Sequence, residues 1–329
     1  MSSTTTTAAA TNRWYLSAAP IARALVHLCV PMAAAMVVSA LYNVINAGFI
    51  GAQHDTSLLA AITFGTPLLG LVSIAYWVTW LQRNSENVSF APKWFTLRAD
   101  ILKPVFGIGV GELLQSAFLI VTTLVLNNLA AAYGDDPLAA MGVAVRIAQV
   151  PEFLVMGVTI GVLPLLAYAF GAGDADRLRS GLRAAALTVG GIVLVFSGTV
   201  FVFREQVFTI FSGDHSVLAI GMTILTAQLV AAVVNGFTGL LTSLFQATGM
   251  VMPAMVLSMA QGVLFIPIVI AGNVWFGLAG IIWALTVTEG IVFVAAVVLW
   301  LATRGRIARG LAEGSAARAD AALEATPVA

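Results

Sequence analysis

Long apolar stretches alternate with short polar connections along most of this chain, and each stretch is long enough to cross a bilayer as a helix. The connections contain glycine, proline, aspartate or clustered basic residues, which are typical of turns and loops. No Asp, Glu, Lys or Arg stands between Asp214 and Glu289. The pattern predicts eight membrane-spanning helices, at residues 24–52, 57–81, 101–128, 138–170, 184–203, 217–246, 253–271 and 278–302.

The segments outside these helices are predicted to be loops or tails. Residues 1–19 are rich in Ser, Thr and Ala and are predicted to be disordered. A short amphipathic surface helix is expected near residues 92–100, and residues 203–216 are expected to form a loop. Residues 304–329 are expected to be a disordered or loosely helical tail.

The composition agrees with a membrane protein and excludes a soluble domain. Hydrophobic residues make up 60% of the chain and charged residues only 9%, against about 25% charged in soluble domains. The predicted fold class is therefore an all-α polytopic membrane protein whose main surroundings are the lipid bilayer. The net charge of zero gives no reason to expect a nucleic-acid partner. Cys29 is the only cysteine, so an intramolecular disulfide is excluded.

The basic residues are distributed unevenly between the two predicted sides of the membrane. With eight spans both termini lie on one side, and every Lys and Arg except Arg146 and Arg204 falls on that side. Short loops rich in Lys and Arg stay in the cytoplasm. The sequence therefore predicts a multi-pass protein of the cell membrane with both termini cytoplasmic.

One acid stands well inside the third apolar stretch, residues 101–128. Placing a carboxylate at mid-membrane costs about 2.5 kcal/mol or more, so such residues are usually functional. Glu112, Gln115 and Asn127 belong to a polar sector of about 140° on this helix, and the opposite face is almost entirely apolar. We predict that Glu112, Gln115 and Asn127 belong to an ion-coupling site, where the acid exchanges a proton or helps to bind Na⁺. The alternative is an acid that hydrogen-bonds to a neighbouring helix for structural reasons.

Other polar residues within the apolar stretches are candidates for two kinds of site. Glu289 is a second candidate for ion coupling, with a structural hydrogen bond as the alternative. Further polar side chains could line a substrate cavity, although packing and hydrogen bonds between helices would also account for them. These cavity candidates are Tyr42, Asn43, Asn46, Arg146, Glu152, Gln228 and Asn235.

The sequence contains no signature of an enzyme. It lacks a Walker loop, a His/Cys cluster with metal-ligand spacing and a nucleophile elbow. The glycine-rich run at residues 107–112 lies in an apolar helix without a preceding strand, so close helix packing explains it better than nucleotide binding. We expect neither a metal site nor a cofactor other than a coupling ion, H⁺ or Na⁺.

Several segments resemble a known family of transporters. The first two helices are similar to the third and fourth, as Ser39-Ala40 and Ser116-Ala117 illustrate, and such repeats are common in transporters. Residues 101–112, 141–179 and 245–259 resemble the C-terminal lobe of the multidrug and toxic compound extrusion (MATE) family. The most specific part is the glycine- and proline-rich helix that ends at Phe170-Gly171-Ala172-Gly173. The resemblance implies a twelve-helix, two-lobe fold with alternating access, and export of organic cations driven by Na⁺ or H⁺.

The chain departs from this family pattern in its first part. Residues 101–303 suffice for a complete six-helix C-lobe, whereas residues 20–100 hold only two helices, about four fewer than an N-lobe needs. The predicted organisation is a tail at 1–19, a shortened N-lobe at 20–100, the C-lobe at 101–303 and a cytoplasmic tail at 304–329. Asn46 stands where many members carry an acid, and Asn cannot titrate.

The resemblance implies an ion-coupled antiporter that exports lipophilic organic cations and drugs. Two alternatives stay open. The chain could be a remnant that does not transport, or one that needs a second copy in a homodimer to rebuild a cavity. It could also be a flippase for a lipid-linked substrate, which predicts more basic residues in the cavity than Arg146 alone.

Overall fold

The computed structural model describes residues 14–53, 72, 74–83, 97–209 and 215–324. The described part is helical throughout, in agreement with the predicted all-α membrane fold. The chain divides into two compact units: residues 38–105 form the smaller, and residues 1–37 together with 106–329 form the larger. The described helices are α2 (Ile21–Gln53), α4 (Ala99–Ala131), α5 (Asp135–Gly171), α6 (Ala175–Val202), α7 (Arg204–Thr209), α8 (His215–Ala247), α9 (Val251–Phe276) and α10 (Leu278–Glu324).

The smaller unit contains the second half of α2, a helical segment at residues 74–83 and the first residues of α4. Tyr76, Trp77 and Trp80 form edge-to-face ring contacts, with centroids 6.0 and 5.7 Å apart. Exposed aromatic rings of this kind are typical of a membrane–water interface. Most of the predicted helix 57–81 and of the predicted surface helix 92–100 lies outside the described residues.

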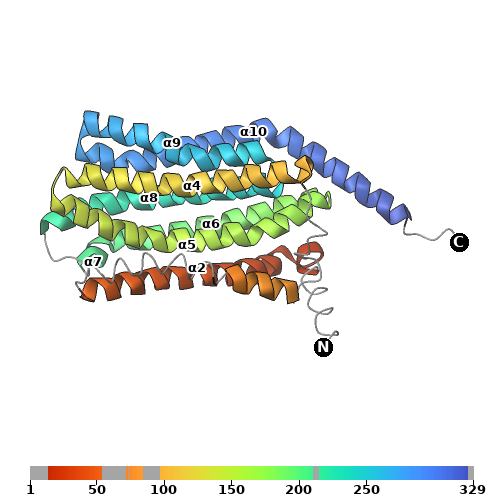
Figure 1. Ribbon diagram of the computed structural model, residues 1–329, viewed down its shortest axis with the longest axis horizontal. Helices are drawn as coiled ribbons and strands as arrows, with labels where there is room; N and C mark the ends of the chain where they lie inside the picture. Colours follow the sequence, from red (N-terminus) through yellow and green to blue (C-terminus); the bar gives the residue numbers. More distant parts are fainter. Residues whose placement is uncertain (1–13, 54–71, 73, 84–96, 210–214, 325–329) are drawn as a thin grey trace. The chain divides into compact units, whose positions relative to one another are not determined.

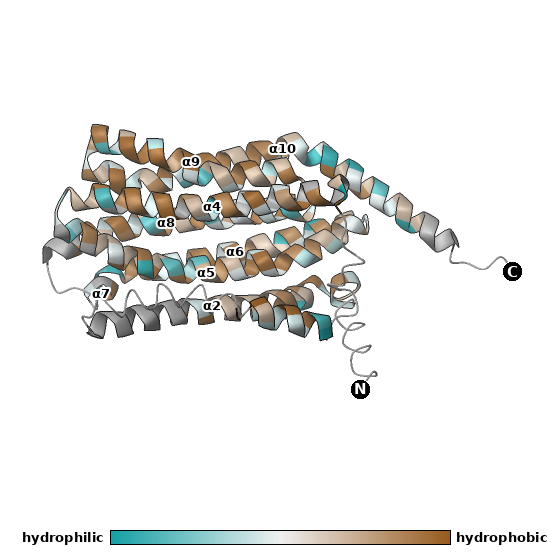
Figure 2. Cartoon of the chain, in the orientation of Figure 1, coloured by the Kyte–Doolittle hydropathy of each residue, from teal (hydrophilic) through white to brown (hydrophobic). Residues whose placement is uncertain are grey.

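The larger unit is a bundle of long helices centred on α5 and α8. These two helices pack against each other, α6 packs against both, and α9 and α10 pack against α8 (Figure 1). Seven helices in the described part of the chain are long and apolar enough to cross a membrane. Figure 2 shows apolar residues along most of these helices and polar residues gathered where α10 extends beyond the others.

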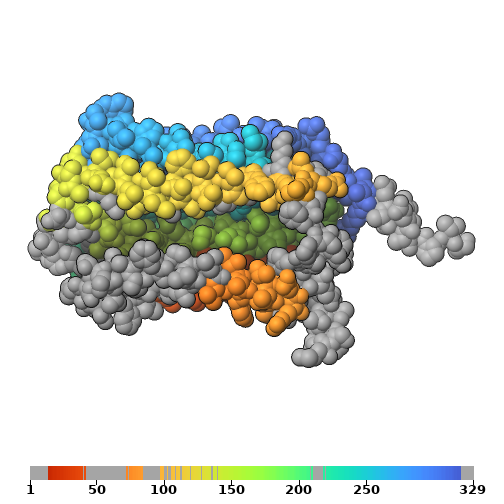
Figure 3. Space-filling view, in the orientation of Figure 1, coloured from red at the N-terminus to blue at the C-terminus, as the bar shows by residue number. Residues whose placement is uncertain are grey.

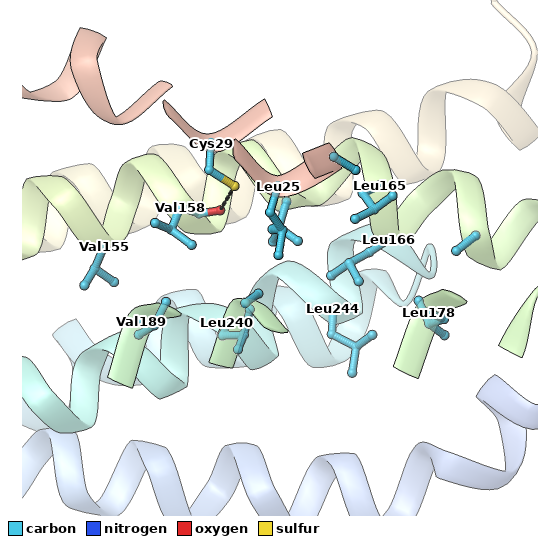
Figure 4. Packing of buried hydrophobic residues seen from close by; sticks show 14 of the residues in the cluster. Leu25, Cys29, Val155, Val158, Leu165, Leu166, Leu178, Val189, Leu240 and Leu244 are labelled. Carbon is cyan, nitrogen blue, oxygen red and sulfur yellow. Dashed lines mark hydrogen bonds between the residues drawn. The ribbon is translucent and has the colours of Figure 1, made fainter. Parts of the chain in front are cut away.

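The first half of α2 packs tightly against α5 through two glycines one turn apart. A Cβ atom at Gly157 would lie 2.7 Å from the backbone nitrogen of Ala33, and one at Gly161 would lie 2.6 Å from the Cα of Cys29. Small residues four positions apart let membrane helices approach closely and gain van der Waals contact. Cys29 Sγ lies 3.6 Å from the carbonyl oxygen of Val158, which it faces across this contact (Figure 4).

Three exposed side chains of α4 are apolar and share one face of the helix. Leu113, Ile120 and Leu124 are 69%, 64% and 57% exposed and repeat at helical spacing. In the space-filling view the yellow α4 forms a continuous ridge (Figure 3). Because these side chains are apolar, this ridge suits a hydrocarbon environment, as predicted for a membrane-spanning helix.

The structure corrects four predicted boundaries. Trp14 to Ser17 are helical and Ala19 is buried, although residues 1–19 were expected to be disordered. Helix α6 begins at Ala175 rather than 184, because the Asp174 side chain accepts a hydrogen bond from Arg177 N and caps it. Residues 204–209 form α7 where a loop was expected. Helix α10 continues to Glu324, far beyond the predicted end at 302.

The extension of α10 is held by its contact with the turn between α5 and α6. Gly173 in that turn has φ 67°, which disfavours any side chain, and a Cβ atom there would overlap the backbone of Ser315. Ile307 is buried in the same apolar cluster as Leu178 of α6. The extension is therefore part of the packed bundle.

Replacing Gly173 with alanine should destabilise this end of the bundle. The backbone strain alone costs about 1–3 kcal/mol, and the new methyl group must also push the α10 extension away. We expect a lower thermal unfolding temperature in detergent. Gly171→Ala is the matched control, because a Cβ atom at Gly171 meets no heavy atom within 4 Å. Equal unfolding temperatures for the two variants would contradict the packing described.

Candidate functional site

Glu289 is the most deeply buried acid in the described part of the chain. It lies on the membrane-spanning part of α10 and is 1% exposed. The preceding residue, Thr288, is fully buried and donates its hydroxyl to the Ala284 carbonyl of its own helix. A carboxyl group in this position is shielded from water, so its charge must be balanced by a proton, a cation or neighbouring polar groups.

Gln261 on α9 supplies one such neighbour. Its side-chain Nε2 donates a hydrogen bond to Oε1 of Glu289. Helices α9 and α10 follow each other through a tight turn at Gly277, where φ is 59°, so the two side chains come from the two arms of one helical hairpin. The hydrogen bond fixes the orientation of the carboxyl group within the hairpin.

Glu152 on α5 is a second carboxyl group that interacts electrostatically with Glu289. It is half-buried, directly follows the buried Pro151, and lies close enough for its charge to act on Glu289. Two poorly hydrated carboxylates repel each other strongly, and a proton or a small cation bound between them relieves that repulsion. Glu152, Gln261 and Glu289 thus form a cluster, here called the acid cluster, that can bind and release a positive charge.

Helix α8 borders this part of α10 and carries the predicted cavity residues Gln228 and Asn235. Thr286 Oγ1 of α10 donates a hydrogen bond to the carbonyl oxygen of Ala227 on α8, at 2.9 Å. The next residue on α8, Gln228, is 7% exposed, and Asn235 is half-buried two turns further along. The bond between Thr286 and Ala227 ties α8 to α10 three residues before Glu289.

The other predicted site residues all lie on helices, and the structure describes the side chains of two of them. Gln115 is half-buried on α4, and Arg146 is exposed on α5. For the remaining candidates the backbone is helical and the side chains lie outside the described part of the structure. These are Glu112 and Asn127 on α4, and Tyr42, Asn43 and Asn46 on α2. Their roles stay predictions.

The structure also joins residues that the sequence assigns to different sites. The sequence predicts Glu289 in an ion site and Glu152 in a substrate cavity, whereas in the structure the charge of Glu152 acts on Glu289. The sequence-based candidates do not include Gln261. The signal for it was present, because Gln261 is the only polar side chain between Ser258 and Asn273 of α9. A lone amide in a membrane helix usually has a partner on another helix.

The chain is similar in sequence to known proteins. Residues 108–271 match the MatE family model. The chain is 30% identical over 278 residues to the multidrug export protein MepA of Staphylococcus saprophyticus, covering 84% of this chain and 61% of that protein. It is 30% identical over 253 residues to MepA of Staphylococcus aureus, covering 77% of this chain and 56% of that protein. The chain thus spans about three fifths of the length of these relatives.

Solved structures share the fold. A crystal structure of MATE in the bent conformation superposes with a TM-score of 0.63 at 20% identity, covering 76% of this chain and 55% of that one. A transporter of the MOP superfamily from Pyrococcus furiosus, described as having a binding pocket of reverse polarity, gives a TM-score of 0.60, covering 74% of this chain and 54% of that one. At this identity the likeness establishes the fold.

Proposed function

Because the chain belongs to the MATE family, we propose that it is an ion-coupled antiporter that exports lipophilic organic cations across the cell membrane. The named relatives are multidrug export proteins. The chain spans only part of their length, so its own transport activity is the first thing to establish.

The acid cluster is the observation that carries this proposal. An antiporter needs a site whose charge changes when the coupling ion binds, and Glu152 and Glu289 supply two carboxyl groups inside a largely apolar bundle. When the ion is absent, the carboxylates repel each other and attract a cationic substrate. When H⁺ or Na⁺ binds, this attraction is lost and the substrate is released. Gln261 keeps Glu289 oriented in both states through its hydrogen bond.

The distribution of basic residues supports an orientation for this transport. Arg177, Arg179 and Arg183 lie in the first turns of α6, and the extension of α10 begins with Arg304 and Arg306. The contact between Gly173 and Ser315 places these two groups at the same end of the larger unit. Under the positive-inside rule this end faces the cytoplasm, and the coupling ion enters from the opposite side.

Purified chain reconstituted in liposomes provides the test. We expect ethidium to move against its gradient when an H⁺ or Na⁺ gradient is imposed, and to stop moving when an ionophore collapses that gradient. Imposing each gradient alone identifies the coupling ion. Folded protein that transports no ethidium under either gradient would contradict the proposal, and would instead favour a chain that does not transport on its own.

A further inference from the structure

A short N-terminal turn is bonded to the beginning of α6 by one arginine. Arg177 Nε donates to the carbonyl oxygen of Leu16 at 2.6 Å, and its Nη2 donates to that of Tyr15 at 2.9 Å. The backbone N–H of Arg177 is itself bonded to Asp174 Oδ1 at 2.9 Å. A guanidinium group presents parallel donors in a rigid plane, so it can hold two successive carbonyl groups at once. The turn is thereby fixed to α6.

The same turn is also attached to α2. The Tyr15 ring stacks on the His27 ring, with centroids 3.9 Å apart and planes 13° from parallel. Trp14 packs edge-on against Tyr15 at 5.1 Å. Ala19 and Ala24, on either side of the start of α2, are 1% and 0% exposed. The turn therefore bridges the first half of α2 and α6, and we call Tyr15, Leu16, His27 and Arg177 the N-terminal latch.

The first half of α2 has a distinct position in the chain. Its residues up to Val37 belong to the larger unit, and the rest of the helix belongs to the smaller one. Within the larger unit it meets α5 at Cys29 and Ala33, across Gly161 and Gly157. Since hydrocarbon chains are as apolar as these side chains, this contact gains little from burial and depends on close packing. The polar bonds of the latch therefore supply an attachment that packing alone does not.

We propose that the N-terminal latch holds the first half of α2 against α5, and that its release lets this half of α2 move away and opens this end of the bundle. In the transport cycle such an opening would admit substrate from the cytoplasm. That role rests on the proposed function, whereas the latch itself does not.

Cys29 offers a built-in reporter of this opening. It is the only cysteine of the chain, it is 6% exposed, and it faces α5 across the contact in question. N-ethylmaleimide can reach its thiol only when α2 separates from α5. With Arg177→Ala we expect labelling about tenfold faster than in the parent chain, which corresponds to about 1.4 kcal/mol in the opening equilibrium.

Arg179→Ala is the matched control, since Arg179 lies on the same helix, is 80% exposed and pairs with Asp176 on the surface at 3.6 Å. It should label at the parental rate. Tyr15→Ala removes the stacking on His27 from the other side of the latch and should also speed labelling. Folding of each variant is judged by its elution in gel filtration and by thermal unfolding. If Arg177→Ala does not fold, the labelling rate of Tyr15→Ala tests the latch.

Parental labelling rates in folded Arg177→Ala and Tyr15→Ala would overturn the proposal. So would equal acceleration in Arg179→Ala, which would point to a general effect of removing positive charge. Because labelling requires no transport, a chain that labels as expected and moves no ethidium would retain the latch and refute the proposed function.

Discussion

Replacing Glu289 with glutamine should reduce ion-driven ethidium efflux to the leak rate of empty liposomes. Glutamine has nearly the shape of glutamate and can still accept the hydrogen bond from Gln261. It cannot carry a negative charge, so it neither attracts the coupling ion nor repels Glu152. Because a buried charge is costly, the variant should be at least as stable as the parent chain in detergent. The expected result is a folded protein without coupling.

Two measurements separate this loss from simple damage. The elution and thermal unfolding of Glu289→Gln in detergent should be no worse than those of the parent chain, which shows that the variant is folded. Glu205→Gln, at an exposed acid on α7, should retain full gradient-driven efflux and serves as the matched control. Full gradient-driven efflux in Glu289→Gln would contradict a coupling role for this residue.

Glu112→Gln completes the comparison between the two candidate coupling sites. The sequence favours Glu112 through the polar face of its own helix, whereas the structure supports Glu289 through a hydrogen bond from α9 and the nearby charge of Glu152 on α5. If Glu112→Gln loses efflux and Glu289→Gln retains it, the coupling site lies on α4. Loss of efflux in both Glu112→Gln and Glu289→Gln would indicate that coupling requires both acids.

The fold was largely predictable because a bilayer imposes a simple rule on sequence. Each span needs about 20 apolar residues, and the stretches that became α5, α8 and α9 are visible directly. Three of the four missed boundaries share one cause. The Arg-rich start of α6 and the segment of α7 are polar, and polarity suggested loops, although the capping Asp174 signals a helix start. The extension of α10 is likewise polar on its outer face.

The acid cluster was only half predictable for a different reason. A helical wheel shows which residues share one face of one helix, and that is how Glu112, Gln115 and Asn127 were identified. Whether Glu152 meets Glu289 depends on how α5 packs beside α10, which no pattern within either helix determines. Gln261 was missed because its importance comes from its partner on the other arm of the hairpin. Single buried polar residues mark candidates, and tertiary packing selects among them.

Replacing Gly157 with leucine should detach the first half of α2 from α5. A Cβ atom at this position would lie 2.9 Å from the Cβ of Ala33 and even closer to the backbone of α2. Because the overlap involves backbone atoms, no side-chain rotation can relieve it, and the two helices must separate. Cys29, one turn from Ala33, should then react with N-ethylmaleimide at least about tenfold faster. The thermal unfolding temperature should fall as well.

Gly142→Leu is the matched control, because Gly142 lies on the same helix and a Cβ atom there meets no heavy atom within 4 Å. It introduces the same side chain into α5 without touching α2, so Cys29 should label at the parental rate. Parental labelling in Gly157→Leu would mean that α2 does not rest on α5 in the membrane. Fast labelling in Gly157→Leu with an intact Arg177 would show that the latch cannot hold the helix against α5 without the glycine contact.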